Sequence, residues 1–276
     1  MVEPAWTRQC AVAGFFYPSD PAVLRQEVMA LLRKANQRNI SGIVRGLVSP
    51  HAGYPYSGLT AAHAYALLQG KRYSTVVIVS PSHREYFNGV SVFPGEFYAT
   101  PLGDVQINSE LRDELLRECP LVQASDAGHH DEHAIEVQLP FLQEVLRNFT
   151  ILPVVMGDQR RDMCLELAGG LARIAQDENV LFIASTDLSH YHSSEIAEQL
   201  DAVMIEDVRA FDWDRLMQDL DAHRTEACGG GPTVAVMAAL SDLGVTRMEI
   251  LNHCNSGDVT GDRDRVVGYL AAAAVA

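Results

Sequence analysis

Short runs of apolar residues alternate along the chain with segments in which apolar residues recur at helical spacing. The runs predict buried strands, and the periodic segments predict helices. Strands are predicted at about 43–49, 75–80, 90–93, 149–155, 179–184, 248–252 and 266–273. Helices are predicted at about 26–36, 58–68, 108–118, 131–147, 162–175, 194–210, 213–220 and 233–243. This alternation indicates an α/β protein with three α/β/α layers and a mostly parallel central sheet.

Two regions depart from the simple alternation. Pro140 falls inside the periodic segment 131–147, where it should kink the helix or split it in two. Short antiparallel strands are expected near 86–105 and 246–260. The sequence contains no internal repeat and no linker rich in Pro, Gly or Ser between two halves. We therefore expect a single domain over residues 1–276.

Two predicted strands end in a proline turn followed by a histidine. The first gives Ser49-Pro50-His51-Ala52-Gly53, and the second gives Ser80-Pro81-Ser82-His83. Ligand sites of open α/β sheets form at the carboxyl ends of the strands. Neutral imidazole is a general ligand for Fe, Cu and Zn, so these two histidines are a candidate metal pair. The alternative is that each is an ordinary loop histidine bonded to a carbonyl group.

A third predicted strand leads into Asp187-Leu188-Ser189-His190-Tyr191-His192. Asp187 and His190 can converge on one site, where the carboxylate would orient the imidazole. His190 would then serve as a metal ligand or as a general base, because its pKa lies near neutrality. In the alternative interpretation, Asp187 or Ser189 caps the helix near residue 194 and His190 is exposed.

Cys228 precedes Gly229-Gly230-Gly231-Pro232 and a predicted helix. A helix N-terminus lowers the pKa of a nearby thiol, and a thiolate can coordinate Fe, Cu or Zn. Glu226 is an alternative carboxylate ligand. Two further interpretations stay open at this stage, namely a small buried cysteine and a glycine loop that binds an anion.

Two more polar segments have a weaker pattern. In the cluster from His129 to His133, we expect His133 near the site, on the same helix face as Glu136. The remainder of this cluster is interpreted as a polar loop. The segment 255–262 is acidic and turn-rich but lacks the spacing of an EF-hand. We expect it to form an ordered turn or the rim of the cleft.

Composition narrows the possible partners and the location. The chain has 276 residues and a formal net charge of -15, which argues against nucleic acid and anionic membrane surfaces as partners. Its longest apolar stretch, Leu270 to Ala276, is much shorter than the roughly 20 residues of a spanning helix. Residues Met1 to Trp6 lack the apolar core of a signal peptide.

The number and spacing of the cysteines also indicate the cellular location. The chain has five of them and no CxxC spacing, so neither a disulfide framework nor a zinc ribbon is expected. They lie at positions 10, 119, 164, 228 and 254. A reducing, cytoplasmic location is therefore expected.

Six motifs, in order, resemble those of the Memo family. They are PHAGYPYSG at 50–58, SPSH at 80–83, EHAIEVQLPFL at 132–142, STDLSHY at 185–191, ACGGGP at 227–232 and SGDVTGD at 256–262. The resemblance covers nearly the whole chain, from GFFYP at 14–18 to VVGY at 266–269. The SGDVTGD form is similar to the prokaryotic branch, which is described as protein B of the AmmeMemoRadiSam system. That resemblance implies a radical-SAM protein and an AMMECR-type protein as partners.

The resemblance also implies a fold related to the class III extradiol dioxygenases, which use non-haem Fe(II). It places His51, His83 and Cys228 at the metal-binding positions and Asp187 and His190 at the remaining cleft positions. His190 matches the acid/base histidine of the dioxygenases. Those enzymes have a carboxylate where this chain has Cys228, and a thiolate favours Cu(I) alongside Fe(II). Redox chemistry with O₂ is therefore more natural here than ring cleavage. The phosphotyrosine-peptide binding linked to animal Memo need not apply.

Taken together, these patterns predict a metal-dependent redox enzyme that binds one Fe(II) or Cu ion per chain and acts on a small molecule of unknown identity. His190, oriented by Asp187, would move a proton to or from O₂ or substrate. His133, Tyr54 and His192 would line the cleft or support its ligands. Two alternatives stay open. One is a non-catalytic module that binds a peptide or protein, and the other is a subunit that acts only with a radical-SAM partner.

Overall fold

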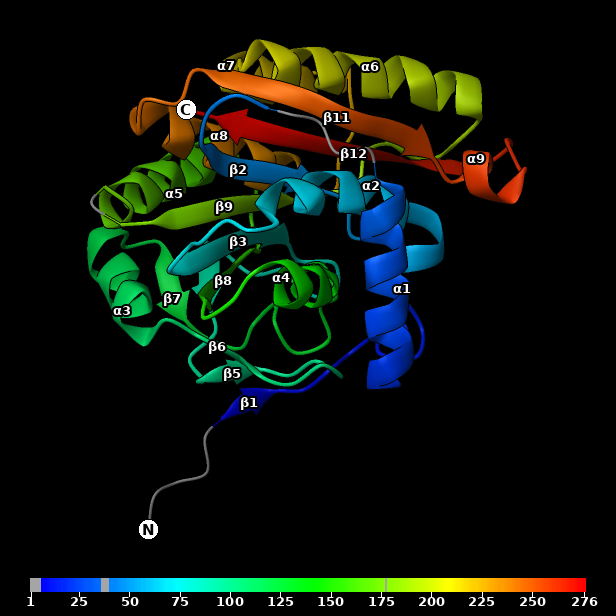
Figure 1. Cartoon of the computed structure of the whole chain (residues 1–276). Helices are drawn as coiled ribbons and strands as arrows, with labels where there is room; N and C mark the ends of the chain where they lie inside the picture. The colour runs from blue at the N-terminus through cyan, green and yellow to red at the C-terminus, as the bar shows by residue number, and fades with distance from the viewer. Residues whose placement is uncertain (1–5, 36–39, 177) are drawn as a thin grey trace.

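The centre of the molecule is a sheet whose inner strands all run in the same direction. The structure, a computed structural model, describes residues 6–35, 40–176 and 178–276. In spatial order, the inner strands are β2 (Val44–Ser49), β9 (Val180–Ser185), β3 (Thr75–Pro81) and β8 (Thr150–Met156). Because these strands are parallel, their carboxyl ends meet at one edge of the sheet (Figure 1).

The margins of the sheet are mainly antiparallel. Beside β2 lies β12 (Val266–Val275), which also pairs with β10 (His190–His192) and β11 (Arg247–Asn255). Beside β8 lies the antiparallel β4 (Val90–Val92), followed by β7 (Val122–Ala124). A separate small sheet consists of β1 (Thr7–Arg8), β5 (Phe97–Tyr98) and β6 (Val105–Gln106). The predicted α/β fold is confirmed, with a parallel centre and antiparallel margins.

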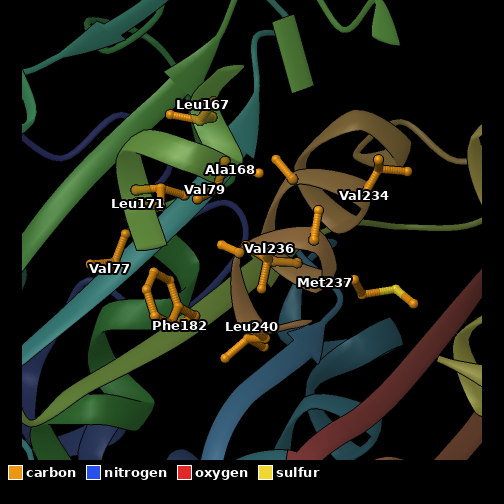
Figure 2. Packing of buried hydrophobic residues seen from close by; sticks show 14 of the residues in the cluster. Val77, Val79, Leu167, Ala168, Leu171, Phe182, Val234, Val236, Met237 and Leu240 are labelled. Atoms are coloured by element: carbon orange, nitrogen blue, oxygen red, sulfur yellow. The ribbon is translucent and has the colours of Figure 1, made fainter. Parts of the chain in front are cut away.

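Helices cover both faces of the sheet because the strand side chains alternate between two apolar clusters. Val77 and Val79 of β3 face one cluster, which contains Leu167 and Leu171 of α5 (Figure 2). Neighbouring β3 side chains face the other cluster, with α1, α2 and α4. The helices are α1 (Pro21–Lys34), α2 (Tyr54–Tyr65), α3 (Ser109–Glu118), α4 (Leu139–Val145), α5 (Arg161–Ile174), α6 (Ser194–Ala210), α7 (Trp213–Asp221), α8 (Gly230–Asp242) and α9 (Gly257–Thr260), with 3-10 turns at Ala66–Leu68 and Glu136–Gln138. Within the described residues, no helix combines the length and the apolar character needed to cross a membrane.

The predicted strands are all present, and most helices lie where their periodicity places them. The helices predicted from residues 26, 58 and 233 begin earlier, at Pro21, Tyr54 and Gly230. The antiparallel strands expected near 86–105 and 246–260 are present as β4, β5, β6 and β11. Two predictions reach outside the described residues. These are the absence of a signal peptide, argued from residues 1–6, and the helix end at Asn36.

The helix predicted over 131–147 is wrong in its first part. Residues 131–135 form no helix, and a 3-10 turn precedes α4, which carries Pro140 in its first turn. Proline lacks the N–H that would continue a helix from the preceding turn. Moreover, the Glu132 carboxylate accepts the backbone N–H groups of His133 and Ala134, which supports a non-helical turn there. His133 and Glu136 therefore do not share a helix face.

A buried pair of carboxyl groups between α6 and α7 gives the fold a pH dependence. Asp207 is fully buried and lies 3.0 Å from Nε of Arg215, while the nearby Asp219 contacts Arg224. Burial and the neighbouring Asp219 carboxyl raise the pKa of Asp207 to about 6, against the opposing charge of Arg215. A carboxyl whose pKa is higher in the folded chain stabilises the fold less as pH rises through about 4 to 6.

We therefore expect Asp207→Asn to raise the thermal midpoint by about 2–5 °C near pH 8 and to change it little near pH 4. The neutral amide replaces a charge that folding disfavours at the higher pH. The control is Asp221→Asn, which removes an exposed carboxyl at the end of α7 and should leave the pH dependence unchanged. Thermal unfolding followed by circular dichroism measures both. An equal shift at the two pH values would contradict the explanation.

Candidate metal centre

The candidate site lies at the edge of the sheet where β2, β3 and β9 end. Ser49 at the end of β2 pairs with Ser185 at the end of β9, so the loops that follow them start side by side. A cavity of about 500 Å³ opens there. Its lining includes His51, His83, His133, Asp187 and His190. Parallel strands thus bring together polar residues that are far apart in the sequence, as expected for an open α/β sheet.

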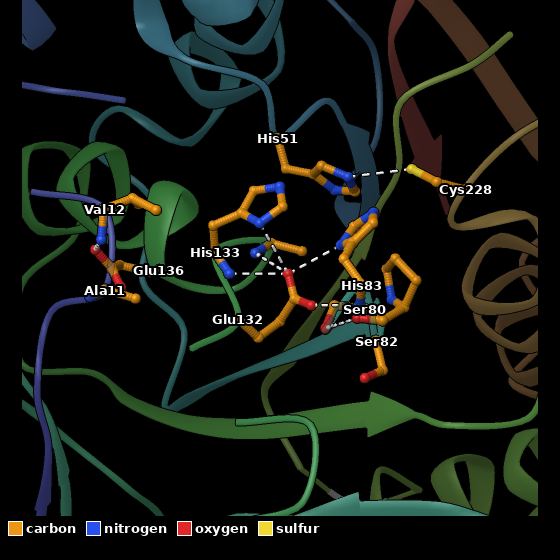
Figure 3. A network of polar contacts seen from close by, with 12 residues as sticks. Ala11, Val12, His51, Ser80, Ser82, His83, Glu132, His133, Glu136 and Cys228 are labelled. Carbon is orange, nitrogen blue, oxygen red and sulfur yellow. Dashed lines mark hydrogen bonds and ion pairs between the residues drawn. The ribbon is translucent and has the colours of Figure 1, made fainter. Parts of the chain in front are cut away.

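Three of the predicted ligands converge beside this cavity. One ligand atom each from His51, His83 and Cys228 lies within 4.8 Å of the other two. The sulfur of Cys228 lies 3.1 Å from Nε2 of His51, and the ring centroids of His51 and His83 are 5.0 Å apart (Figure 3). Cys228 comes from the turn before α8, so three separate segments supply the set. His51 is buried, whereas His83 faces the opening.

Hydrogen bonds fix the tautomer of His51. The Ser185 hydroxyl donates to the carbonyl of Ala134 at 2.7 Å and accepts the side-chain amide of Gln138 at 2.8 Å. Its one hydrogen is therefore used, and it can only accept from Nδ1 of His51, which lies 3.0 Å away. Burial, together with the nearby His133 and His83, lowers the pKa of His51 well below its usual value. His51 is thus neutral and directs the lone pair of Nε2 toward Cys228.

Glu132 has the corresponding role for His83. Its Oε1 lies 2.9 Å from Nδ1 of His83, and its Oε2 accepts the backbone N–H of the same residue at 2.6 Å. Burial alone would raise the pKa of Glu132, but contacts with His133 and His83 hold it well below its usual range. A carboxylate only accepts hydrogen bonds, so Nδ1 of His83 carries a proton, and Nε2 is the nitrogen that could bind a metal ion. Sequence reasoning missed the role of Glu132, although this residue lies within the cluster from His129 to His133.

The surroundings of Cys228 raise the pKa of its thiol, contrary to the prediction from the helix N-terminus. Burial and the nearby Asp187 carboxylate raise the pKa of this thiol far above its ordinary value. The backbone N–H of Asp187 donates to the sulfur at 3.3 Å, a contact that also suits a thiolate. A bound metal cation would supply the missing positive charge, and a coordinating thiol is deprotonated outright. Metal binding at this site would therefore release a proton.

The triple glycine serves packing, and the structure contradicts the anion-loop interpretation. The N–H groups of Gly229 and Gly231 donate to the side chains of Thr186 and Gln159. A Cβ atom on Gly229 would lie 2.3 Å from the carbonyl oxygen of Ser185. These glycines allow the start of α8 to approach the end of β9, and this approach brings the sulfur of Cys228 to Nε2 of His51. Their donors are already used by the protein.

Asp187, His190 and His133 all line the cavity. Asp187 is buried, its carboxylate accepts the backbone N–H of His51 at 2.8 Å, and burial raises its pKa. His190 is partly buried on β10. The rings of His133 and His83 stack with centroids 4.7 Å apart. All three side chains thus stand beside the set of His51, His83 and Cys228 without forming part of it.

Other predicted residues lie away from the cavity. Tyr54 is buried, donates its hydroxyl to the carbonyl of Val137 at 2.7 Å and packs on Phe141, so it supports α2 rather than lining the cleft. His192 contacts the Glu226 carboxylate at 2.9 Å, which places both outside the set with Cys228. The segment 255–262 forms α9 and an ordered turn, in which Asp258 accepts the backbone N–H of Asn255.

The residues present fit a soft transition-metal ion. Two imidazoles that are hydrogen-bonded through Nδ1 and one thiol offer an N/N/S donor set for Fe(II), Cu or Zn. Nδ1 of each imidazole makes a hydrogen bond to another side chain, Ser185 for His51 and Glu132 for His83, as in most metal-ligating histidines. The remaining side of the set faces the cavity, which leaves room for a further ligand.

Comparison with known proteins finds relatives over nearly the whole chain. A family model described as "Memo-like protein" matches residues 8–273. A MEMO1 family protein of Methanosarcina mazei is 41% identical over 267 residues, covering 96% of this chain and 97% of the relative. Another, of Methanocaldococcus jannaschii, is 38% identical over 281 residues, covering 96% and 98%. One of Thermoplasma volcanium is 38% identical over 265 residues, covering 95% and 96%.

Proposed function

The chain belongs to the Memo family, and on that premise we propose that it is a metal-dependent redox enzyme that uses O₂. His51, His83 and Cys228 would hold one Fe(II) or Cu ion. The observation that carries this proposal is the convergence of two histidines in the same tautomer with a cysteine, at one end of an open cavity. A thiolate in place of a carboxylate makes the donor set softer and favours Cu(I) alongside Fe(II), which supports redox chemistry.

The cavity suits a small organic molecule. Its volume of about 500 Å³ lies within the range of ordinary small-molecule sites. Aromatic side chains surround its mouth, among them Phe15 and Tyr191, which are 87% and 65% exposed. Tyr191 has a φ of 62°, a conformation that most residues avoid and that concentrates at functional sites. The polar candidate ligands at the bottom of the cavity and the apolar side chains at its mouth support the proposal that a small-molecule substrate binds there.

The residues around this cavity would have different roles in the reaction. When bound, the metal ion would supply one-electron chemistry toward O₂. His190 would donate or accept a proton at the cavity wall, because an imidazole can do either near neutral pH. Asp187, which is buried beside the ligands, would orient His51 through its backbone and hold negative charge near the cation. The aromatic mouth would exclude water from the reacting atoms.

Oxygen uptake by the loaded protein tests the redox proposal. With ascorbate as donor, two electrons and two protons would reduce one O₂ to H₂O₂, and uptake should require the bound ion. His190→Gln should lower the uptake rate by about a hundredfold or more, because it removes the proton donor. His192→Gln, a matched change outside the cavity, should leave the rate nearly unchanged.

Metal binding without oxygen uptake would refute the redox proposal for the isolated chain. It would favour the second proposal, that the chain is a subunit acting with a radical-SAM protein and an AMMECR-type protein. An unchanged rate in His190→Gln would remove His190 from the proton path while leaving the metal site intact.

A further inference from the structure

We infer that Glu132 is a positioning residue that fixes the ring orientation and tautomer of His83 and holds His133 beside it. The inference concerns the metal-free protein, and its link to metal affinity rests on the proposed function. Figure 3 shows the Glu132 carboxylate between the two rings, with Glu136 turned away toward Ala11 and Val12. One buried acidic side chain thus connects a candidate metal ligand to a second imidazole in the cavity.

Backbone donors fix the Glu132 carboxylate in place. Oε2 accepts the N–H of His83 at 2.6 Å, and Oε1 accepts the N–H groups of His133 and Ala134 at 2.8 and 2.9 Å. The side chain is 3% exposed, so water does not compete for these oxygens. Since N–H groups of the main chain can only donate, the carboxylate is an acceptor at both oxygens whatever occupies the cavity.

The ring of His83 must adapt to this acceptor. Its Nδ1 lies 2.9 Å from Oε1 and therefore carries the hydrogen, which leaves the lone pair on Nε2. Nδ1 of His133 approaches the same oxygen at 3.1 Å, and its ring stacks on that of His83. The carboxylate thereby determines which nitrogen of His83 is available to an ion and how far His133 stands from it.

The main chain around Glu132 is also fixed, through Arg8 of β1. The Arg8 guanidinium donates to the carbonyl groups of Glu132 and His129, the latter at 2.9 Å, and pairs with Glu136. These contacts hold the non-helical segment that carries Glu132 against the small sheet. A positioning role for Glu132 requires that its own main chain be held rigidly, and the Arg8 contacts do this.

A second metal ion is the rival explanation of this cluster. His83, Glu132 and His133 each offer an atom within 4.8 Å of the other two. A metal bound there would displace the hydrogen on Nδ1 of His83, whereas the 2.9 Å contact and the backbone donors are already satisfied by hydrogen bonds. The two explanations predict different numbers of bound ions and different effects of an amide at position 132.

Histidine ¹⁵N correlation spectra of the metal-free protein provide the first test. We expect His83 of the natural protein to be the Nδ1–H tautomer and Glu132→Gln to lose this preference, because an amide also donates. Glu132→Asp retains a carboxylate and should preserve it in part. The control is Glu85→Gln, which removes a carboxylate that accepts the Gly128 N–H in the neighbouring loop. An Nε2–H tautomer for His83 in the natural protein would overturn the inference, even if no variant folds.

Titration with Co(II), an optical probe of the site, provides the second test. Glu132→Gln should lower the affinity by about 10–100-fold, as removal of a residue behind a ligand does, while keeping the thiolate band of Cys228. Unchanged affinity would overturn the positioning role. Two ions bound to the natural protein and one to Glu132→Gln would make Glu132 a ligand instead. Failure of the natural protein to bind Co(II) would count against the proposed function and leave the spectral test of Glu132 standing.

Discussion

Replacing Cys228 with Ala is expected to lower the affinity of the protein for Fe(II) and Cu(I) by more than about a hundredfold. Loss of a residue that only hydrogen-bonds to a metal ligand already lowers metal affinity by up to about a hundredfold, and loss of the ligand itself should cost more. The sulfur is the only soft donor of the set formed with His51 and His83. Its removal leaves two imidazoles, which cannot supply the negative charge that a buried cation requires. Cu(I), which prefers thiolate most strongly, should show the larger loss.

The matched control for this substitution is Cys254→Ala. Cys254 is partly buried on β11, where its sulfur contacts the Thr60 hydroxyl at 3.0 Å outside the cavity. Its removal should leave both affinities unchanged. Competition with a chelator of known affinity, under anaerobic conditions, measures each constant. Equal affinities for Cys228→Ala and the natural protein would remove Cys228 from the ligand set.

Replacing Arg8 with Met is expected to lower the free energy of unfolding by about 3–5 kcal/mol, because it leaves a buried charge without its partner. Arg8 is 3% exposed, and the Glu136 carboxylate with which it pairs is fully buried. Glu136 also accepts the Tyr17 hydroxyl and the N–H groups of Ala11 and Val12. These donors cannot neutralise the carboxylate, so the charge of Arg8 is what makes its burial tolerable.

Urea denaturation of three variants measures this effect. Arg8→Met combined with Glu136→Gln should recover part of the loss, because the second change removes the uncompensated charge. Arg33→Met, which replaces an exposed arginine in the last turn of α1, should change stability little. A loss in Arg8→Met no larger than in Arg33→Met would show that the pair contributes nothing. The pair also ties the first strand to the segment that carries Glu132.

The strand ends of the site could be predicted from the sequence because each has a strong local pattern. The runs before His51, His83 and Asp187 are apolar and short, and the proline turns after two of them mark where the strands stop. Parallel pairing then brings their carboxyl ends together without further information. Cys228 required the resemblance to the Memo family, since a cysteine before glycines has several ordinary explanations.

The part that sequence reasoning missed depends on contacts between distant segments. Glu132 belongs to a stretch with helical spacing, but its carboxylate turns back to the N–H groups of His133 and Ala134 and to His83. Nothing local distinguishes it from the neighbouring acidic residues. The high pKa of Cys228 was missed for a similar reason, because burial outweighs the helix N-terminus only when the surroundings are known. Local patterns thus located the two candidate histidine ligands, whereas the chemical state of the candidate site depends on tertiary contacts.

Anaerobic titration of the metal-free protein with Fe(II) and with Cu(I) tests the central claim most directly. The claim is that His51, His83 and Cys228 form one metal site at the edge of the sheet. The predicted result is tight binding that saturates at one ion per chain. Replacement of either His51 or His83 by Ala should abolish this binding. No binding of either ion, or binding that survives replacement of both His51 and His83 by Ala, would contradict it.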